Sequence, residues 1–457
     1  GLLITAPSGA EEKAAEASSA KSYSPYAGRT YPTKVFWGDT HLHTAYSVDA
    51  GIFGNRLGMD EAYRFARGEE VVATFGQPAA LSRPLDFLVI ADHSDGYGMF
   101  PLLQKGDPRL MKHESARRWH EMIKQGGPKA VQAASEMVDL FSRGKIPFDY
   151  NDPALRGPVW EEVIAAAERH NEPGVFSAFI GYEWTSLVPP GNNLHRVVIY
   201  RDGGDKASQT LPVTAQESLD PEYLWKALSV YETKTGGKIL AIPHNANLSN
   251  GMMFAPVDFG GQPLTRDYAE RRQRWEPLCE VTQIKGDGET HPLLSPNDEF
   301  ADYETWDKGN LNLSQAKTEE MLQYEYGRSA LEIGLQLEEK LGVNPYKFGM
   351  IGATDSHTSL STAAEENFFG KHSNTEPSPA RTAHPASASS DRSLVIQGWE
   401  YVSSGYAGVW ATENTRQAIW DAMMRKEVYA TTGPRMTVRF FGGWDFEPGD
   451  ARTRTPA

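Results

Sequence analysis

The chain contains one cysteine, no long apolar run and no excess of basic residues. A single cysteine among 457 residues excludes an intrachain disulfide, and nitrogen and oxygen atoms must therefore hold any bound metal. We expect Cys279 to be a small buried apolar residue. No run of about 18 apolar residues occurs, so no membrane-spanning helix is predicted. The formal net charge of -15 disfavours binding to duplex nucleic acid, which requires a basic face.

Two histidines follow an apolar stretch near the start of the chain. His41 and His43 come shortly after Val35-Phe36-Trp37 and are separated by one residue. Side chains alternate along a strand, so both imidazoles point to the same face. This arrangement suits one metal ion, although an isolated pair is equally typical of structural histidines. Its meaning depends on the rest of the chain.

Four further apolar runs end in residue types that bind metals. Such runs are typical of strands buried on both faces, and polar residues at their carboxyl ends are the layout of a barrel or doubly wound active site. The runs cover residues 85–91, 176–180, 239–243 and 348–353, and they lead into Asp92-His93-Ser94-Asp95, Glu183, His244, and Asp355 with His357. A further histidine, His195, opens a strand-like run at 195–200. The repeated coincidence predicts a metal site with catalytic character.

Helical patterns alternate with these strands, which favours an α/β fold with a mainly parallel sheet. The helical patterns cover residues 59–67, 108–124, 128–142, 158–170, 221–234, 329–341 and 414–426. Two more strand-like runs follow at residues 428–431 and 436–441.

The spacing of the motifs suggests one body with insertions. We expect a flexible N-terminal segment at residues 1–30, a barrel-like body at 31–441 and a tail at 442–457, with a native chain that can extend beyond either end. Long polar segments beside a metal site are typical of a cap that shapes substrate access. Such insertions are predicted at about 99–150, 246–346 and 365–392.

The composition of residues 1–30 bears on location. They are rich in Ala, Ser, Glu and Lys after Leu2-Leu3-Ile4, as in a spacer that follows a removed signal peptide. This favours a periplasmic or secreted protein over a cytoplasmic one. In the Ser- and Pro-rich segment 365–392, His372 and His384 are interpreted as solvated loop residues.

Taken in chain order, these motifs resemble the polymerase and histidinol phosphatase (PHP) superfamily of metal-dependent phosphoesterases. The matching pieces are Asp39-x-His41-x-His43-Thr44 with Ser47-x-Asp49, Asp92-His93, Gly181-Tyr182-Glu183, His195, Pro243-His244 and Asp355-x-His357. The chain looks most like a bacterial subgroup known mainly as a domain of unknown function. The pieces that carry this closer likeness are Trp37-Gly38-Asp39-Thr40-His41, Gly181-Tyr182-Glu183-Trp184-Thr185 and Ala430-Thr431-Thr432-Gly433-Pro434-Arg435.

The resemblance implies a distorted (β/α)7 TIM-like barrel, with helical and loop insertions forming a cap over the C-terminal strand ends. It also implies two to three divalent metal ions, for which imidazole and carboxylate ligands allow Zn, Mn or Fe. By this likeness His41, His43, Glu183 and Asp355 would hold the first ion. Glu183 would bridge to a second ion held by His195 and His244, and a third would lie between Asp49, His93 and His357, with Asp49 where some members have His.

The predicted activity is metal-dependent hydrolysis of a small-molecule phosphate ester, either a monoester or a diester. Two close cations lower the pKa of a bridging water and clamp the attacking and leaving oxygens, so a metal-bridging hydroxide is the expected nucleophile. Hydrolysis of an amide, lactone or sulfate ester is an alternative enzyme reaction, since metal-activated water attacks many electrophiles. A non-catalytic metal-binding barrel is the third alternative.

Other polar residues have predicted supporting roles. Asp39 and Asp92 adjoin predicted ligands and would orient them, although Asp92 could equally cap the following turn. Asp95 and His291 are the candidate catalytic acids, and a turn in the cap is the alternative role for His291. Possible anion-binding residues, which the sequence does not rank, are Lys285, Arg328 and Arg56.

Overall fold

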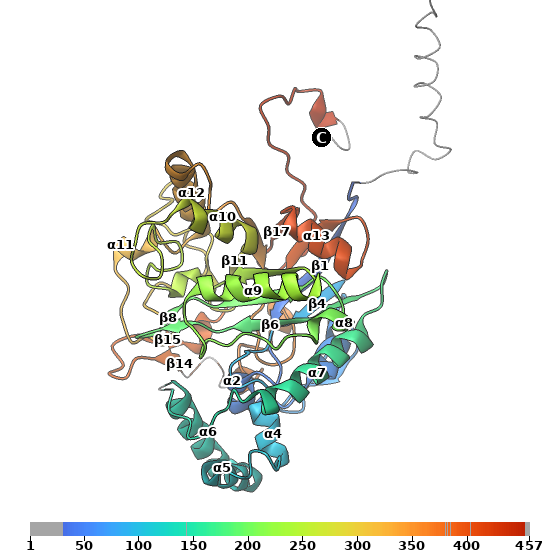
Figure 1. Ribbon diagram of the computed structural model, residues 1–457, viewed down its shortest axis with the longest axis vertical. Coiled ribbons are helices and arrows are strands. Elements are labelled where there is room, and N and C mark those ends of the chain that lie inside the picture. The colour runs from blue at the N-terminus through green and yellow to red at the C-terminus, as the bar shows by residue number, and fades with distance from the viewer. Residues whose placement is uncertain are drawn as a thin grey trace, which may run out of the picture.

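The protein was analysed as a computed structural model that describes residues 31–452, except 143, 380, 382, 384 and 403 (Figure 1). The predicted N-terminal segment 1–30, His384 and the last part of the tail at 442–457 lie outside the described residues. The described chain is a mixed α/β structure with several small sheets. None of its helices is long and apolar enough to cross a membrane.

Three sheets form the centre of the molecule. The first has the order β17-β16-β1-β4-β5, the second β10-β9-β6 and the third β12-β11-β13. The bounds of their strands are β1 Lys34–Leu42, β4 Phe87–Ile90, β5 Ser177–Phe179, β6 Gly181–Trp184, β9 Arg196–Tyr200, β10 Ile239–Pro243, β11 Leu278–Gln283, β12 Gly286–Asp287, β13 Gly349–Gly352, β16 Ala407–Ala411 and β17 Val428–Ala430. Three two-stranded ribbons join β2 Val71–Val72 to β3 Pro78–Ala79, β7 Leu187–Val188 to β8 Asn192–Asn193, and β14 Pro385–Ala388 to β15 Val395–Gln397.

The strand directions correct the prediction of a mainly parallel sheet. The pairs β1–β4, β4–β5 and β11–β13 are parallel, whereas β9 and β16 run antiparallel to both of their neighbours. The reason at β9 is the short connection from β6, which contains only the β7–β8 ribbon. A parallel crossover needs about a dozen residues or more and usually a helix. The chain therefore turns back on itself at this point.

Two isolated parallel bridges connect the sheets at one end. Leu42, at the end of β1, pairs with Ser356 beyond β13, and His93, beyond β4, pairs with Glu183 in β6. These contacts bring the carboxyl ends of strands from all three sheets together, because β10 and β11 supply His244 and Glu280 to the same place. The predicted distorted barrel stays a prediction.

Most predicted helices are confirmed, with shifted ends. The helices are α2 Val48–Ile52, α3 Met59–Ala66, α4 Met99–Lys105, α5 Glu114–Gln125, α6 Gly127–Ser142, α7 Pro153–His170, α8 Gly204–Ala207, α9 Pro221–Thr235, α10 Arg266–Trp275, α11 Glu319–Leu322, α12 Gly327–Leu341 and α13 Arg416–Met424. Helix α7 begins before the predicted residue 158, because the Asp152 side chain accepts a hydrogen bond from the Ala154 amide and caps the helix there. The predicted strand at 436–441 is wrong, since these residues form no strand.

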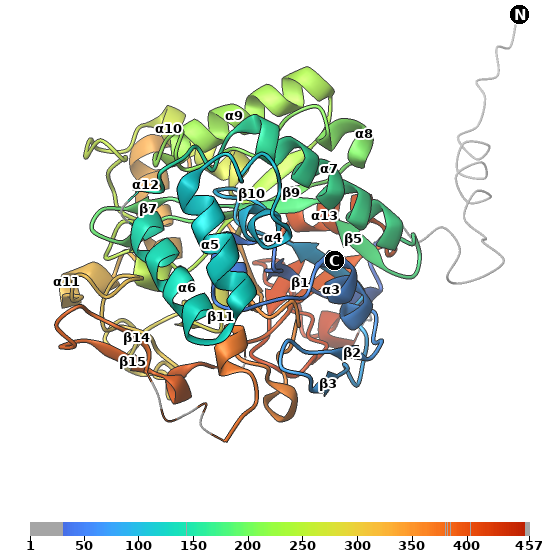
Figure 2. The ribbon, with the colours of Figure 1, turned by 90° about the horizontal axis from the view of Figure 1, so that it is seen from below.

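The helices α4, α5 and α6 lie together on one side of the sheets (Figures 1 and 2). They bury their own apolar cluster, which includes Trp119 and Met137. The same cluster takes in Val48 and Ile52 of the short helix α2, which also carries Asp49. The helical segment predicted as an insertion at 99–150 therefore packs directly against an element that holds a predicted ligand.

The segment 246–346 was predicted as an insertion over the site, but part of it belongs to the third sheet. It contains β11, which pairs in parallel with β13 from Leu278–Gly349 onward. Cys279 in this strand is buried and free, as expected. The sequence Leu-Cys-Glu-Val-Thr-Gln was not recognised as a strand because a charged residue interrupts its apolar pattern. That residue, Glu280, faces the site described below.

The antiparallel contact between β16 and β17 yields a test of the fold. A methyl group at Gly405 would lie 1.1 Å from the carbonyl oxygen of Thr431, so Gly405→Ala must displace backbone. We expect this substitution to lower the free energy of unfolding by more than about 2 kcal/mol in urea denaturation. Gly157→Ala is the control, because its position in α7 is open and Ala should stabilise the helix by roughly 0.5–1 kcal/mol. Equal effects of the two substitutions would contradict this packing.

Candidate metal centre

The strand directions explain how His195 reaches the other predicted ligands. It immediately precedes β9, and Arg196 pairs with both Trp184 of β6 and Pro243 of β10. Because β9 runs antiparallel to these strands, its amino end lies beside their carboxyl ends. His195 therefore lies next to Glu183 and His244, although it starts a strand rather than ends one.

Glu183 is the carboxylate that contacts most of the predicted ligands. Its side chain is 1% exposed, and its oxygens lie 2.7 to 3.4 Å from imidazole nitrogens of five histidines. These histidines come from four separate segments of the chain, so no local turn accounts for the cluster. They are His41, His43, His93, His195 and His244.

Three groups of side chains place their ligand atoms within 4.8 Å of one another. All members of the groups are buried, and two histidines belong to two groups each. The groups are His41 with Glu183 and His244, His41 with His43 and Asp355, and His43 with His93 and His357. Together these groups are suited to hold divalent metal ions.

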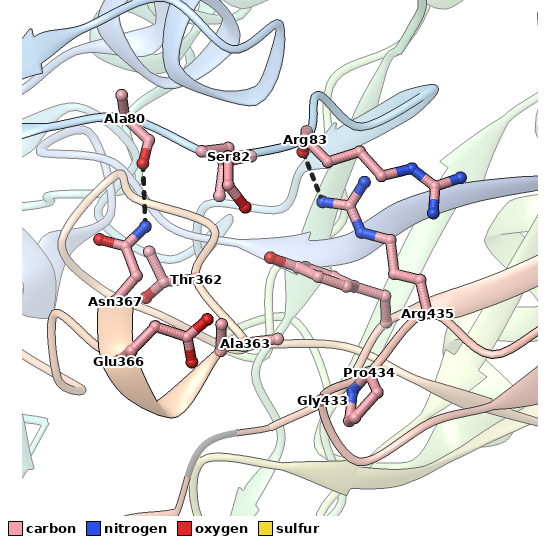
Figure 3. A pocket seen from close by; sticks show the side chains of 13 residues that line it. Ala80, Ser82, Arg83, Thr362, Ala363, Glu366, Asn367, Gly433, Pro434 and Arg435 are labelled. Atoms are coloured by element: carbon pink, nitrogen blue, oxygen red, sulfur yellow. Dashed lines mark hydrogen bonds between the residues drawn. The ribbon is translucent and has the colours of Figure 1, made fainter.

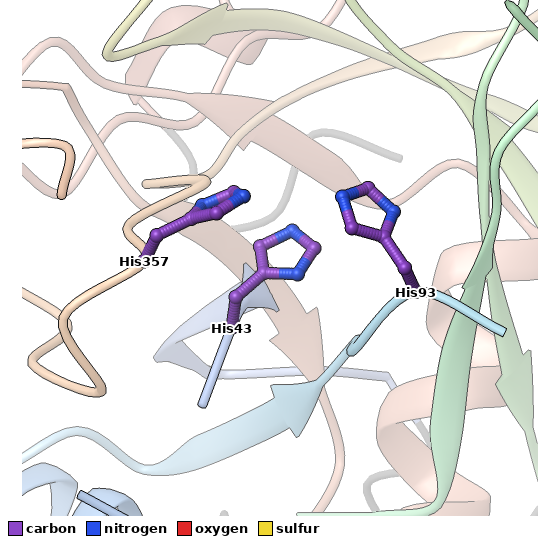
Figure 4. Close-up of side chains that lie close together, drawn as sticks. All are labelled: His43, His93 and His357. Atoms are coloured by element: carbon purple, nitrogen blue, oxygen red, sulfur yellow. The ribbon is translucent and has the colours of Figure 1, made fainter. Parts of the chain in front are cut away.

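The third group brings three imidazole rings together from the segments that follow β1, β4 and β13 (Figure 4). The Asp49 carboxylate joins this group, because its Oδ2 lies 2.8 Å from His357 Nε2 and 3.2 Å from His93 Nε2. The structure thus brings all nine predicted ligands into one connected cluster, in which Asp49 contacts His93 and His357, and His195 contacts Glu183. Their role as ligands stays a prediction.

Unpaired buried atoms indicate that the cluster fits a cation. His195 Nε2, His244 Nδ1 and Glu280 Oε1 are buried and have no hydrogen-bond partner among the described residues. His41 Nε2 and His43 Nε2 lie only 3.0 Å apart, so two nitrogens are directed at the same space. Unsatisfied buried polar atoms are costly, and metal coordination would satisfy several of them at once.

The protonation of part of the cluster also suits metal binding, which requires neutral imidazoles and ionised carboxylates. Burial lowers the pKa of His43 to about 4 and that of His195 to about 3. Burial alone would raise the pKa of Glu183, but the imidazoles of His93 and its neighbours lower it well below its ordinary value. For His93 the acidic neighbours overcome burial and raise the pKa to about 10.

Asp39 and Asp92 hold the backbone on which the predicted ligands sit. Asp39 Oδ1 accepts hydrogen bonds from the amides of His41 and Thr354, each at 3.0 Å, and thereby joins two ligand segments. Asp92 accepts from the amide and the hydroxyl of Thr44 at 2.6 and 2.7 Å. Burial raises the pKa of both carboxyls, that of Asp92 to about 6. Both residues position ligand segments rather than ligand rings.

The two candidate acids, Asp95 and His291, make other contacts. The Asp95 carboxylate accepts hydrogen bonds from the side chain of Asn151 and the amides of Ala215 and Gln216. His291 Nε2 lies 3.2 Å from the carboxylate of Asp307, and its Nδ1 accepts from the amide of Leu293. In the described part of the chain, none of these hydrogen bonds reaches a predicted ligand. Their catalytic role stays untested.

Three charged residues join the cluster at Asp355 and His41. Glu280 Oε2 lies 3.0 Å from His41 Nδ1, and the ammonium groups of Lys285 and Lys371 both contact the Asp355 carboxylate. Sequence reasoning missed Glu280 and Lys371. A lone carboxylate in the apolar strand β11 was a usable signal for Glu280, whereas nothing in the polar segment around Lys371 distinguishes it.

The backbone at Asp355 is strained. Its φ of 52° lies in the left-handed region, as does that of Asn245 at 48°. Gln283 Nε2 donates to side-chain oxygens of both residues at 2.8 Å and so ties these two turns together. Strained backbone of this kind occurs mainly at functional sites, where the surroundings hold it in place.

His372 corrects the interpretation of a solvated loop histidine. Its ring centroid lies 4.8 Å from that of His357 and 4.7 Å from that of Phe53. Burial lowers its pKa to about 3. The reason is that the segment 365–376 folds back over the metal cluster, as Lys371 shows.

A separate cavity of about 340 Å³ lies between residues 80–83, 362–367 and 433–435 (Figure 3). None of the nine predicted ligands lines it. The Arg435 guanidinium donates to the carbonyl oxygens of Pro84 and Arg83 and lies over the ring of Tyr406. Arg435 therefore joins the segment 433–435 to residues 83 and 84, and its guanidinium has hydrogen-bond partners within the protein.

Substitution of Glu183 tests the metal cluster. Glu183→Gln removes the negative charge that faces five imidazoles, and we expect metal affinity to fall by at least about tenfold. Elemental analysis after dialysis measures the bound metal. His120→Ala is the control, because its ring contacts the Leu103 carbonyl in the helical segment. Full metal content in Glu183→Gln would contradict the assignment.

The pH dependence of metal stabilisation gives a second test. Without metal, His93 has a pKa of about 10 and is protonated at neutral pH, so metal binding must release its proton and weakens as pH falls. At a free metal concentration of about 100 times Kd, the gain in unfolding free energy is about 2.7 kcal/mol. Thermal unfolding at pH 8 and pH 6, with metal or chelator, should show a smaller metal-dependent gain at pH 6. A larger gain at pH 6 would be incompatible with histidine ligation.

Comparison with known proteins places the chain in a family. No curated protein matches it. A crystal structure from Bacteroides vulgatus, of a two-domain protein containing a predicted PHP-like metal-dependent phosphoesterase, is similar at 11% identity with a TM-score of 0.35, over 88% of this chain and 67% of that one. The model of a family described as a protein of unknown function, DUF3604, matches residues 30–457. The chain therefore belongs to the DUF3604 family.

Proposed function

We propose that the protein is a metal-dependent hydrolase of phosphate esters. The observation that carries this proposal is the buried Glu183 carboxylate, which lies within 3.4 Å of five imidazoles and links the three candidate metal groups. Adjacent groups with shared ligands are the arrangement used to hold two or more ions a few Å apart. A structural metal site would need only one closed set of four ligands.

Bound divalent ions would supply an activated water and neutralise charge on the ester oxygens. The chain's own residues set up this chemistry. Glu183 would contribute a carboxylate to bound ions, and the imidazoles with lowered pKa, such as His43 and His195, offer neutral nitrogen atoms at neutral pH. Asp39 and Asp92 hold the loops that carry these groups, so the donor atoms are positioned before a metal arrives.

We also propose that the three sheets belong to the distorted (β/α)7 barrel expected from the sequence. The two parallel bridges, Leu42–Ser356 and His93–Glu183, support this proposal because each joins the carboxyl end of one strand to a neighbouring sheet. In such barrels the active site lies at the carboxyl ends of the strands. The helices α4 to α6 would then form part of the cap. Two to three ions of Zn, Mn or Fe are the proposed cofactors.

Hydrolysis of model esters tests the proposal. The protein loaded with Mn or Zn is expected to hydrolyse p-nitrophenyl phosphate or bis-p-nitrophenyl phosphate, and chelation should abolish the activity. Glu183→Gln should lower kcat/KM by at least about a hundredfold, because the ions lose their shared carboxylate. The release of p-nitrophenol measures the rate.

Control measurements distinguish phosphate ester hydrolysis from hydrolysis of the alternative substrates. His120→Ala should leave kcat/KM unchanged, since its ring lies in the helical segment. A p-nitrophenyl sulfate ester and an amide substrate run in parallel. Turnover of either without phosphate ester hydrolysis, or equal rates for wild type and Glu183→Gln, would refute the proposal.

A further inference from the structure

Two lysines lie at the metal cluster without belonging to the predicted ligands. The Lys371 ammonium lies 2.6 Å from Asp355 Oδ1, and the Lys285 ammonium contacts Asp355 Oδ2. Their side chains are 4% and 13% exposed. Lysine is almost never buried unless it is paired, so two such side chains at one place require an explanation.

The two lysines share one carboxylate, that of Asp355. Among the described residues, Asp355 is the only carboxylate within 4.0 Å of either ammonium. Two amino groups thus contact one carboxylate, and Asp355 Oδ1 also lies 3.2 Å from His43 Nε2 and 3.5 Å from His41 Nε2. A metal ion held by these groups would compete with both lysines for the same oxygens.

We propose that Lys285 and Lys371 form an anion-binding subsite, defined by these two residues, that takes the dianionic phosphate group of a phosphate monoester. This inference rests on the proposed function and narrows its substrate class. When a cation engages Asp355, each ammonium needs a new negative partner, and a phosphoryl oxygen beside the metal centre supplies one. A monoester offers two negative charges for two ammoniums, whereas a diester offers one.

The two lysines come from different segments of the chain. Lys285 follows β11 directly, where its amide donates to the Gln283 side chain that also holds Asp355. Lys371 lies in the segment 365–376 that folds over the cluster, and its ammonium also donates to the Asp355 carbonyl. A group bound by both would contact β11 and its following turn through Lys285 and the segment 365–376 through Lys371.

Phosphate binding and kinetics test the subsite. Inorganic phosphate is titrated into the metal-loaded protein by calorimetry, and p-nitrophenyl phosphate is compared with bis-p-nitrophenyl phosphate. Lys285→Met and Lys371→Met should each weaken phosphate binding at least about tenfold and raise KM for the monoester similarly, with less than about threefold effect on the diester. Lys371→Arg, which keeps the charge, should restore part of the affinity. Lys308→Met is the control, because Lys308 pairs with Glu400.

Elemental analysis of each variant separates the outcomes. The proposal is supported if both methionine variants keep full metal content and lose phosphate affinity. It is overturned if wild type binds no phosphate, if both variants bind it as wild type does, or if they lose metal instead, which would mean that the lysines only position Asp355. Lysine-dependent phosphate binding in a protein that hydrolyses no ester would refute the proposed function and leave the subsite standing.

Discussion

The contact between the buried Glu183 carboxylate and the surrounding imidazoles is the interaction on which the rest of the site depends. Burial of a carboxylate is unfavourable unless positive or hydrogen-bonding groups compensate for it. Here the compensating histidines lie in or next to β1, β4, β9 and β10. All four strands must therefore be folded for Glu183 to be compensated. Strand pairing therefore assembles the site. The loss of one histidine would also change the surroundings of Glu183 and of the other histidines.

The reversed strand β9 shows how topology determines chemistry. Its direction places His195 beside the carboxyl ends of β6 and β10, and the short β6–β9 connection leaves no alternative. The two bridges between sheets do the same for His43, His93 and Asp355, whose segments otherwise belong to different sheets. Hydrogen-bonded carboxylates, such as Asp39, then fix the loops. The result is a set of donor atoms that converge before any cation is bound.

Much of this arrangement could be predicted from the sequence, because most of the nine candidate ligands lie at the ends of apolar runs, whereas Asp49 was expected only from the family resemblance. The rough location of the residues at strand ends needed only the rule that such ends meet, and the resemblance added their assignment as ligands. The direction of β9 could not be predicted, since a strand looks the same in either orientation. Glu280 was missed because a charge inside an apolar strand weakens the strand pattern, and Lys371 and His372 because their burial depends on a loop whose path the sequence does not indicate. The predicted insertion at 246–346 was too long for the same reason as Glu280 was missed, because the strand β11 within it was not recognised.

The central claim is that the nine side chains form one multinuclear metal centre. The most direct measurement is anomalous X-ray diffraction from a metal-soaked crystal, recorded on both sides of the absorption edge of the metal. The account predicts two or three anomalous peaks within coordination distance of these side chains, with Glu183 adjacent to at least two of them. The absence of any peak in the cluster, with metal bound elsewhere or not at all, would contradict it.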